Sequence, residues 1–284
     1  MSKRKLTIGI LSICIICALA IGGTLAFLTD SEKVTNTFSI GDLDITIDEP
    51  HWNDEGTPDD PETPDTDEST PGDGEDMTPG DTKVKDPTVT AVVNNGYMRV
   101  IMTVIDNEPT IPNPDYVDDA TTPDVEPTVA NPNYGKAITD QDRLDLIFDT
   151  IYYDSTYNVN SDPATTAIVP GEKYALADLE AYPTVNPSFT ADTDKSTAGT
   201  YYYNYNEIFN EGDKAVLFTN VVIPTDWNQT QMNVMGKYKI EVYAQAIQSD
   251  NFANAEEAFA ALDAEIEAGT VQFNYATVGD KSDR

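Results

Sequence analysis

Residues 237–247 read KYKIEVYAQAI, and this stretch decides the class of fold. Its side chains alternate along the chain, with a mostly polar face opposite an apolar face that carries Tyr238, Ile240, Val242, Ala244 and Ala246. Alternation with a period of two is typical of a β-strand that has one face in a hydrophobic core. The stretch therefore predicts a half-buried strand of the antiparallel type.

Similar runs recur along the chain. Residues 98–104 and 43–47 also alternate between apolar and polar side chains, whereas residues 215–223 are apolar on both faces, as expected of a central strand. Two more strands are predicted at residues 84–93 and 201–205. Together these runs predict at least six strands.

Helical patterns are scarce. Residues 139–147 predict a short helix capped by Thr139, and residues 254–268 predict a longer one that is capped by Asn254 and ends at Gly269. Many strands with turn-rich connections and few helices predict an all-β fold, namely a jelly-roll-like antiparallel β-sandwich with a few short helices and long acidic loops.

The N-terminus has the pattern of an export signal. A basic segment, Lys3 to Lys5, precedes residues 6–29, which contain no charged side chain and are long enough to span a bilayer. Small residues at Thr24 and Ala26 predict cleavage after Ala26, which leaves Phe27 as the mature N-terminus. An uncleaved membrane anchor is the alternative. In either case, the protein would touch a membrane only through this segment.

The chain therefore divides into a signal peptide at residues 1–26, a mature N-terminal segment at residues 27–37 and a single sandwich domain at residues 38–284. Both cysteines, Cys14 and Cys17, lie inside the signal, so the mature protein is expected to have no disulfide.

The charge is strongly acidic. Sixteen Lys and Arg against fifty Asp and Glu give a net charge of −34, which excludes nucleic acid as a partner bound through charge. Twenty of the acids fall in two proline-rich stretches without Lys or Arg, thirteen in residues 48–80 and seven in residues 106–133. Such stretches repel themselves and cannot bury a core, so they predict extended, solvated insertions.

Calcium binding is a more specific interpretation of these acids than a solvated spacer. Asp65, Asp67 and Glu68 come closest to alternating ligands, but no window supplies the glycine and the final glutamate of an EF-hand loop. The solvated spacer is therefore favoured, and no metal or cofactor is expected.

Catalytic motifs are missing as well. His51 is the single histidine and lies in the first acidic stretch, which we expect to be mobile, and no zinc-protease, nucleophile-elbow or Walker pattern occurs. A pair of carboxylates acting across a cleft stays open, because nothing in the sequence selects the pair. The sequence thus predicts a protein that is not an enzyme.

Aromatic side chains gather at residues 201–205, where Tyr201, Tyr203 and Tyr205 would share one face of a strand and Tyr202 the other. They either pair across an ordinary sheet, which is favoured, or stack on sugars. Trp52 and Trp227 are interpreted as local packing anchors.

Several short motifs carry a family resemblance. Residues 22–30, GGTLAFLTD, followed by residues 35–45, TNTFSIGDLDI, resemble the start of the exported TasA and camelysin (CalY) proteins. Weaker similarities follow at residues 49–52, EPHW, at residues 85–89, KDPTV, and in the tyrosine cluster. Only the N-terminal block is specific.

The resemblance implies a sandwich protein that is processed by a SipW-type signal peptidase and exported by a Gram-positive-type bacterium. It further implies fibres of the biofilm matrix, in which the mature N-terminal segment adds a strand to a neighbouring copy. Phe27, Leu28, Val34 and Phe38 alternate weakly and are the candidate donor-strand residues. A frayed terminus is the alternative.

The leading expectation is therefore a secreted structural protein of the cell surface or matrix that assembles with itself. The second is a surface binding module, an adhesin or glycan binder. The third is a camelysin-like secreted metallopeptidase, for which the sequence offers no zinc motif.

Overall fold

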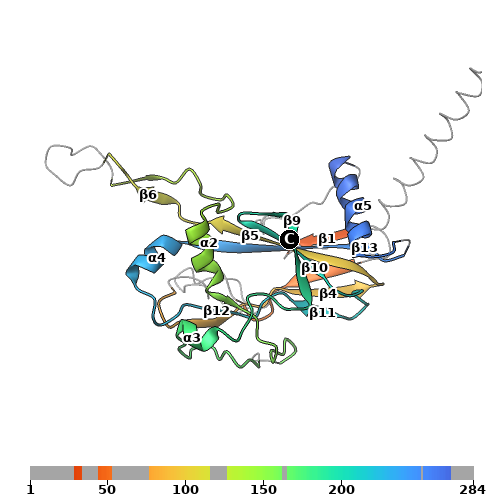
Figure 1. The fold of residues 1–284 in the computed structure, drawn as a ribbon, viewed down its shortest axis with the longest axis horizontal. Helices are drawn as coiled ribbons and strands as arrows, with labels where there is room; N and C mark the ends of the chain where they lie inside the picture. The colour runs from red at the N-terminus through yellow and green to blue at the C-terminus, as the bar shows by residue number, and fades with distance from the viewer. Residues whose placement is uncertain are drawn as a thin grey trace, which may run out of the picture.

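The computed structural model describes residues 29–33, 44–52, 77–115, 127–161, 165–250 and 252–269. Antiparallel strands form two layers that face each other across a hydrophobic core (Figure 1). The first layer is a five-stranded sheet with the order β1 (Thr29–Lys33), β13 (Tyr238–Gln248), β5 (Gly96–Asp106), β10 (Thr200–Tyr205) and β9 (Phe189–Thr197).

The second layer consists of two three-stranded sheets. One has the order β11 (Lys214–Val216), β4 (Thr88–Val93) and β2 (Asp44–Asp48), and the other has the order β3 (Thr82–Val84), β12 (Asn220–Val222) and β8 (Ile151–Tyr152). Hydrogen bonds from Lys85 N to Thr219 O and from Leu217 N to Pro87 O, both 3.0 Å, bridge the gap between them. The two sheets are thus successive parts of one layer.

The prediction of continuous strands at residues 84–93 and 215–223 was wrong in the middle of each. The first is interrupted at residues 85–87 because Pro87 has no N–H to donate, and the Thr88 hydroxyl bonds back to the Asp86 carbonyl at 2.7 Å. The second is interrupted at residues 217–219, opposite the first break.

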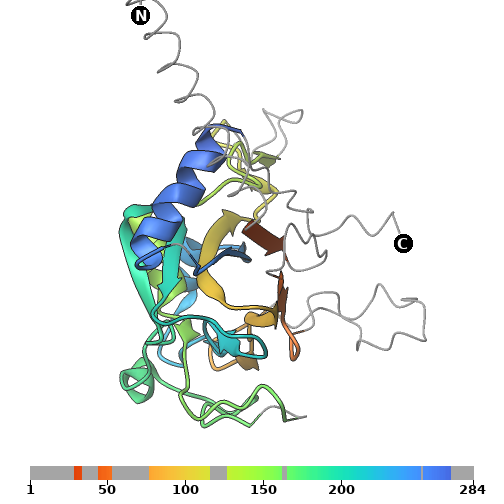
Figure 2. The ribbon, with the colours of Figure 1, turned by 90° about the vertical axis from the view of Figure 1, so that its right-hand side faces the viewer.

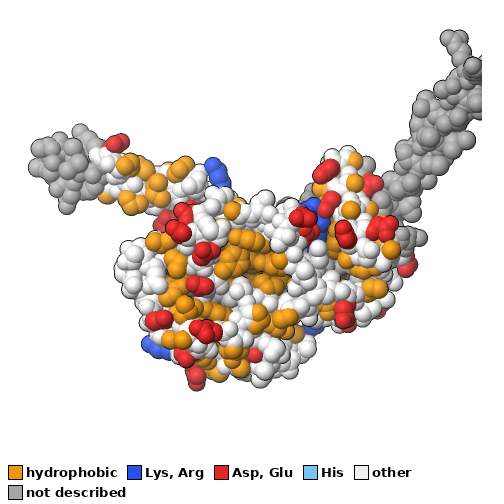
Figure 3. All heavy atoms as spheres, in the orientation of Figure 1, with side chains coloured by type: hydrophobic (Ala, Val, Ile, Leu, Met, Phe, Trp, Pro, Cys, Tyr) orange, Lys and Arg blue, Asp and Glu red, His pale blue; other side chains and the backbone are white. Residues whose placement is uncertain are grey.

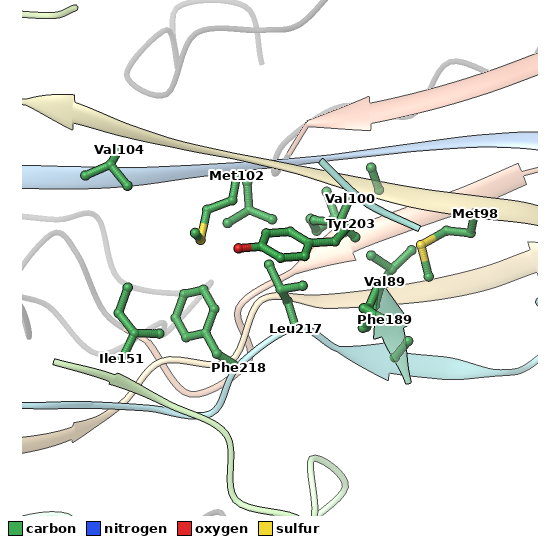
Figure 4. Close-up of a cluster of buried hydrophobic side chains, with 14 of the residues drawn as sticks. Val89, Met98, Val100, Met102, Val104, Ile151, Phe189, Tyr203, Leu217 and Phe218 are labelled. Atoms are coloured by element: carbon green, nitrogen blue, oxygen red, sulfur yellow. The ribbon is translucent and has the colours of Figure 1, made fainter. Parts of the chain in front are cut away.

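Side chains from both layers fill the core, as Figure 4 shows. Alternate residues of β5 point inward and meet Tyr203 of β10 and Leu217 and Phe218 of the opposite layer; those of β5 are Met98, Val100, Met102 and Val104. The predicted apolar face of residues 237–247 lies in the same core through Val242, Ala244 and Ala246. The all-β sandwich is thereby confirmed.

Four helices are described. α2 (Gln141–Phe148) packs against α4 (Gln229–Met235), and α3 (Leu176–Leu179) is a single turn. The N-cap of α2 is Asp140, whose carboxylate accepts a bond from Arg143 N at 3.0 Å, so the predicted cap Thr139 was wrong by one residue. Neither α3 nor α4 was predicted.

α5 (Ala255–Glu267) lies on the outer face of the five-stranded sheet (Figure 2). Its predicted cap Asn254 is confirmed, since the side chain accepts a bond from Glu257 N at 2.9 Å. Phe259 and Leu262 of the helix pack on Ile247 of β13. The helix therefore covers a face that would otherwise be open to water.

Within residues 106–133, where only a solvated insertion was expected, a short hairpin forms. β6 (Thr110–Pro112) pairs with β7 (Thr128–Ala130), and the pair projects from the sandwich as an arm (Figure 1). Its strands are mostly exposed, with Val129 at 38% exposure. No helix in the described part of the chain is long and apolar enough to cross a membrane.

Candidate functional site at the N-terminal edge

The N-terminal strand β1 forms one edge of the five-stranded sheet. It runs antiparallel to β13, with a register from Thr29 opposite Ile247 to Lys33 opposite Tyr243. β13 is paired with β5 along its whole length and extends from Tyr243 back to Tyr238 beyond the described pairing with β1. β1 is thus hydrogen-bonded to one strand, β13, and also lies next to β2.

The residues predicted from the sequence fall around this strand. The cleavage-site residues Ala26 and Phe27 and the donor-strand residues Leu28, Val34 and Phe38 lie outside the described residues, so both assignments stay predictions. Between them, residues 29–33 do form a strand at a sheet edge.

A cluster that we call the His51 clamp holds the chain directly after β2. It consists of Glu49, His51 and Trp52 on one side and Lys85, Asp86 and Tyr157 on the other. The Lys85 ammonium lies 2.9 Å from Glu49 Oε2 and 4.3 Å from the centroid of the Trp52 ring. A cation held between a carboxylate and an aromatic face fixes both partners in place.

His51 bonds through three of its nitrogens. Its backbone N donates to Asp86 Oδ1 at 3.1 Å, Nδ1 lies 2.8 Å from Asp86 Oδ2, and Nε2 lies 2.9 Å from the Ser161 carbonyl oxygen. The Asp86 side chain is fully buried and that of His51 is 16% exposed. The single histidine therefore serves as a structural crosslink, contrary to the expectation of a mobile segment.

Tyr157 completes the clamp by donating its hydroxyl proton to Asp86 Oδ2, with its oxygen 3.0 Å from His51 Nδ1. Burial, together with the bond to Asp86 and the charge of that carboxylate, raises the pKa of Tyr157, so the hydroxyl keeps its proton. Each ring nitrogen of His51 thus lies within hydrogen-bond distance of an oxygen, Nδ1 of Asp86 Oδ2 and Nε2 of the Ser161 carbonyl.

Sequence reasoning missed the clamp. Its two halves, residues 49–52 and 85–89, were recognised only as separate pieces of a resemblance, and nothing in their spacing indicated that they meet. Tyr157 carried no signal at all.

A groove opens next to the clamp. Its volume is about 980 Å³, and Trp52 and Lys85 of the clamp form part of its wall together with Met77, the start of β13, α4 and the base of the arm. Among its described lining residues Glu108 is the one acid, beside Lys85 and Lys237. Elsewhere on the molecule, acidic side chains are widespread, as the face in Figure 3 shows.

The side chains of the tyrosine cluster pack against other residues of the protein. Tyr203 is buried, Tyr201 packs edge-on against Phe148 at 4.9 Å, and Tyr205 packs between Phe189 and Phe209 at 5.3 Å from each. Tyr202 faces the other way, toward Arg99. The predicted division of faces is confirmed, and Tyr201, Tyr203 and Tyr205 take part in the packing of the sheet.

No group of three or more His, Cys, Asp or Glu side chains suited to a metal ion occurs within the described ranges. The calcium candidates Asp65, Asp67 and Glu68 lie outside them.

Comparison with known proteins gives one match. Residues 1–58 match the family model described as Camelysin metallo-endopeptidase. No curated protein and no solved structure matches the chain. The match suggests an exported surface or biofilm protein. Over residues 1–58 the chain is thus similar to the camelysin family, as its N-terminal motifs suggested.

Proposed function

We propose that this protein is a secreted structural component of the cell surface or biofilm matrix, and that it assembles into fibres by adding its N-terminal strand to a neighbouring copy. A SipW-type signal peptidase would release the segment that begins at Phe27. The family match at residues 1–58 supports export, and it covers the signal, β1 and β2.

The position of β1 is the observation that carries the proposal. β1 has five residues and is hydrogen-bonded to one strand, so removing it breaks fewer hydrogen bonds than removing a central strand, which is bonded on both sides. The edge of β13 from Tyr243 to Ile247 accepts this strand within one chain, so it fits the same strand from another chain.

The clamp limits how much of the N-terminal chain can detach from the sandwich. Glu49, His51 and Trp52 stay attached to the second layer through Lys85 and Asp86 whether or not β1 is in place. A copy that gives up β1 therefore keeps β2 fixed at its far end.

Proline substitutions in β1 test strand addition through the backbone alone. The backbone N–H groups of adjacent strand residues point to opposite sides, so either Ser31 or Glu32 donates its N–H to β13. We therefore expect one of the two variants, Ser31→Pro or Glu32→Pro, to abolish the fibres seen by electron microscopy, because proline removes that donor. Ser31→Ala and Glu32→Ala are the matched controls and should form fibres as the wild type does.

Deleting residues 27–36 should likewise prevent fibres while circular dichroism still reports a folded sandwich. The proposal fails if purified mature protein stays monomeric under all conditions, or if both proline variants assemble normally.

We further propose that the protein is not a peptidase. Its single histidine is engaged through both ring nitrogens in the clamp. Peptide cleavage by the purified protein that disappears on chelation and returns with zinc would contradict this.

A further inference from the structure

The groove beside the clamp combines an apolar floor with a polar rim. Val221, Ile223 and Met235 line it and are themselves buried, so they form its floor. Its volume of about 980 Å³ is at the upper end of the range for sites of small ligands, about 300–1,000 Å³. The groove thus has room for a ligand of several rings that offers both apolar and hydrogen-bonding groups.

Aromatic side chains reach the groove from two parts of the chain. Trp52 belongs to the clamp, where the Lys85 ammonium lies over its ring, and Tyr134 lies at the base of the arm with 53% of its side chain exposed. Because the clamp fixes Trp52 in advance, little ordering remains for a ligand to induce. Such rings suit sugars, since both partners have an apolar face and a polar edge.

Amide side chains supply the polar part of the rim. Among the described lining residues, Asn107, Gln229 and Asn233 carry such amides, and all three residues are exposed. On α4, Gln229 Nε2 donates to Asn233 Oδ1 at 2.8 Å, which leaves the Gln229 oxygen as an acceptor and the Asn233 nitrogen as a donor. A sugar hydroxyl both donates and accepts, so it can bond to either group, whereas a fatty chain can bond to neither.

The charge of the chain favours a neutral ligand. The protein has a net charge of −34, and the sequence between Trp52 and Met77, which both line the groove, is rich in Asp and Glu. A glycan with carboxylate, sulfate or phosphate groups would be repelled by these charges. A neutral glycan is not affected by them.

We propose that the groove binds a neutral glycan that carries N-acetyl groups. The Trp52 and Tyr134 rings pack on its sugar faces, and the Gln229 and Asn233 amides bond to its hydroxyl and acetamido groups. An N-acetyl group adds a methyl for the apolar floor, which a plain hexose lacks. This activity is separate from the proposed assembly, because neither β1 nor its partner residues 243–247 are among the described residues that line the groove.

Tryptophan fluorescence of the mature protein can test the proposal. The chain has two tryptophans, and Trp227 is buried in the core, so a change of emission with ligand reports Trp52. The probe is chitohexaose, a neutral oligomer of N-acetylglucosamine. Cellohexaose is the matched ligand, because it has the same linkage but hydroxyls in place of the acetamido groups. We expect a saturable change with chitohexaose and at least tenfold weaker binding of cellohexaose.

Variants of the rim identify the site. Tyr134→Ala and Asn233→Ala should each weaken chitohexaose binding about tenfold without unfolding the protein, since both side chains are exposed. Tyr134→Phe keeps the ring and should bind nearly as the wild type does. Val234→Ala is the matched control, because Val234 is an exposed apolar residue of α4 outside the groove lining.

Three results would overturn the proposal: no saturable change with chitohexaose, equal affinity for cellohexaose, or an affinity of Tyr134→Ala equal to that of Val234→Ala. The Ser31→Pro and Glu32→Pro variants should bind chitohexaose as the wild type does. The outcome is therefore independent of whether the protein forms fibres.

Discussion

Asp86 shows how one buried group organises its surroundings. Its carboxylate is fully buried, and a buried charge is tolerated only when donors surround it. Three donors do so: the backbone N and the Nδ1 of His51, and the Tyr157 hydroxyl. His51, which lies in an acidic stretch of the sequence, thus supplies hydrogen bonds that the carboxylate of Asp86, 35 residues later, needs.

We expect Asp86→Asn to lower the free energy of unfolding by about 1.5–3 kcal/mol, because the amide nitrogen cannot accept the bonds that the charged oxygen receives. Tyr157→Phe, which removes one donor, should cost less. Asp194→Asn, at an exposed position of β9, is the control and should stay within about 0.5 kcal/mol of the wild type. Urea unfolding curves measure all three, and equal midpoints for Asp86→Asn and Asp194→Asn would show that the clamp contributes no stability.

At the scale of elements, α5 is fastened to the sheet by a charge network. Arg99 of β5 is nearly fully buried and donates to both carboxylate oxygens of Asp263, through Nη1 at 3.1 Å and through Nη2 at 2.5 Å. Lys195 contacts the same carboxylate, and the Arg99 guanidinium also lies 4.9 Å from the Phe259 ring. The helix thus supplies the counter-charge that Arg99 needs.

Acid should therefore release α5. Burial alone would raise the pKa of Asp263, but the bonds and charges of Arg99 and Lys195 outweigh it and hold the pKa below its usual range. The stabilisation is complete above the ordinary aspartate value of about 3.9 and is lost as the pH falls through the depressed folded value. Hydrogen exchange of residues 255–267 should rise in that window before the core strands exchange.

Asp263→Asn provides the matching test of this network. It should speed exchange in α5 already at neutral pH and remove most of the acid dependence, because Arg99 then lacks its partner. Glu267→Gln, at an exposed position on the same helix, should leave the wild-type profile unchanged. An α5 that stays protected at pH 2 would refute the network's role.

The strands that could be predicted are those whose sequence alternates between apolar and polar residues or is continuously apolar. β13 and β5 alternate clearly, whereas the mostly exposed β9 has no such contrast and was missed. The strand breaks at residues 85–87 and 217–219 were also missed: Pro87, which has no N–H to donate, could have indicated the first, whereas the second lies in an apolar run and is set by its contacts with the first. The cap at Asp140 in place of Thr139 shows the usual error of one residue at a helix end.

The candidate site was predictable only where it is local. The similarity to camelysin and the expectation of export came from adjacent residues near the N-terminus, close to where β1 forms. The clamp and the network around Arg99 join residues that are 33 to 164 positions apart, and one sequence does not reveal such pairings.

At the scale of the whole molecule, the charge is distributed unevenly. Twenty acids lie in residues 48–80 and 106–133, and two of them, Glu49 and Asp106, are paired with Lys85 and Arg143 of the sandwich. Two copies that approach each other therefore repel each other mainly through the remaining acids of these stretches. Pairing at the sheet edge formed by β1 and β13 would use backbone hydrogen bonds, which carry no net charge.

Assembly should consequently strengthen as salt is added. The screening length falls from about 10 Å at 0.1 M to about 3 Å at 1 M, which removes repulsion between insertions but leaves backbone strand pairing intact. Mild acid near pH 4.5, which begins to neutralise ordinary carboxylates, should act in the same direction. Light scattering against ionic strength measures the effect. A variant with amides at Asp54, Glu55, Asp73, Glu75 and Asp76 keeps the prolines and should assemble at lower salt than the wild type. Assembly that weakens as salt rises would instead show that attraction between opposite charges joins the copies.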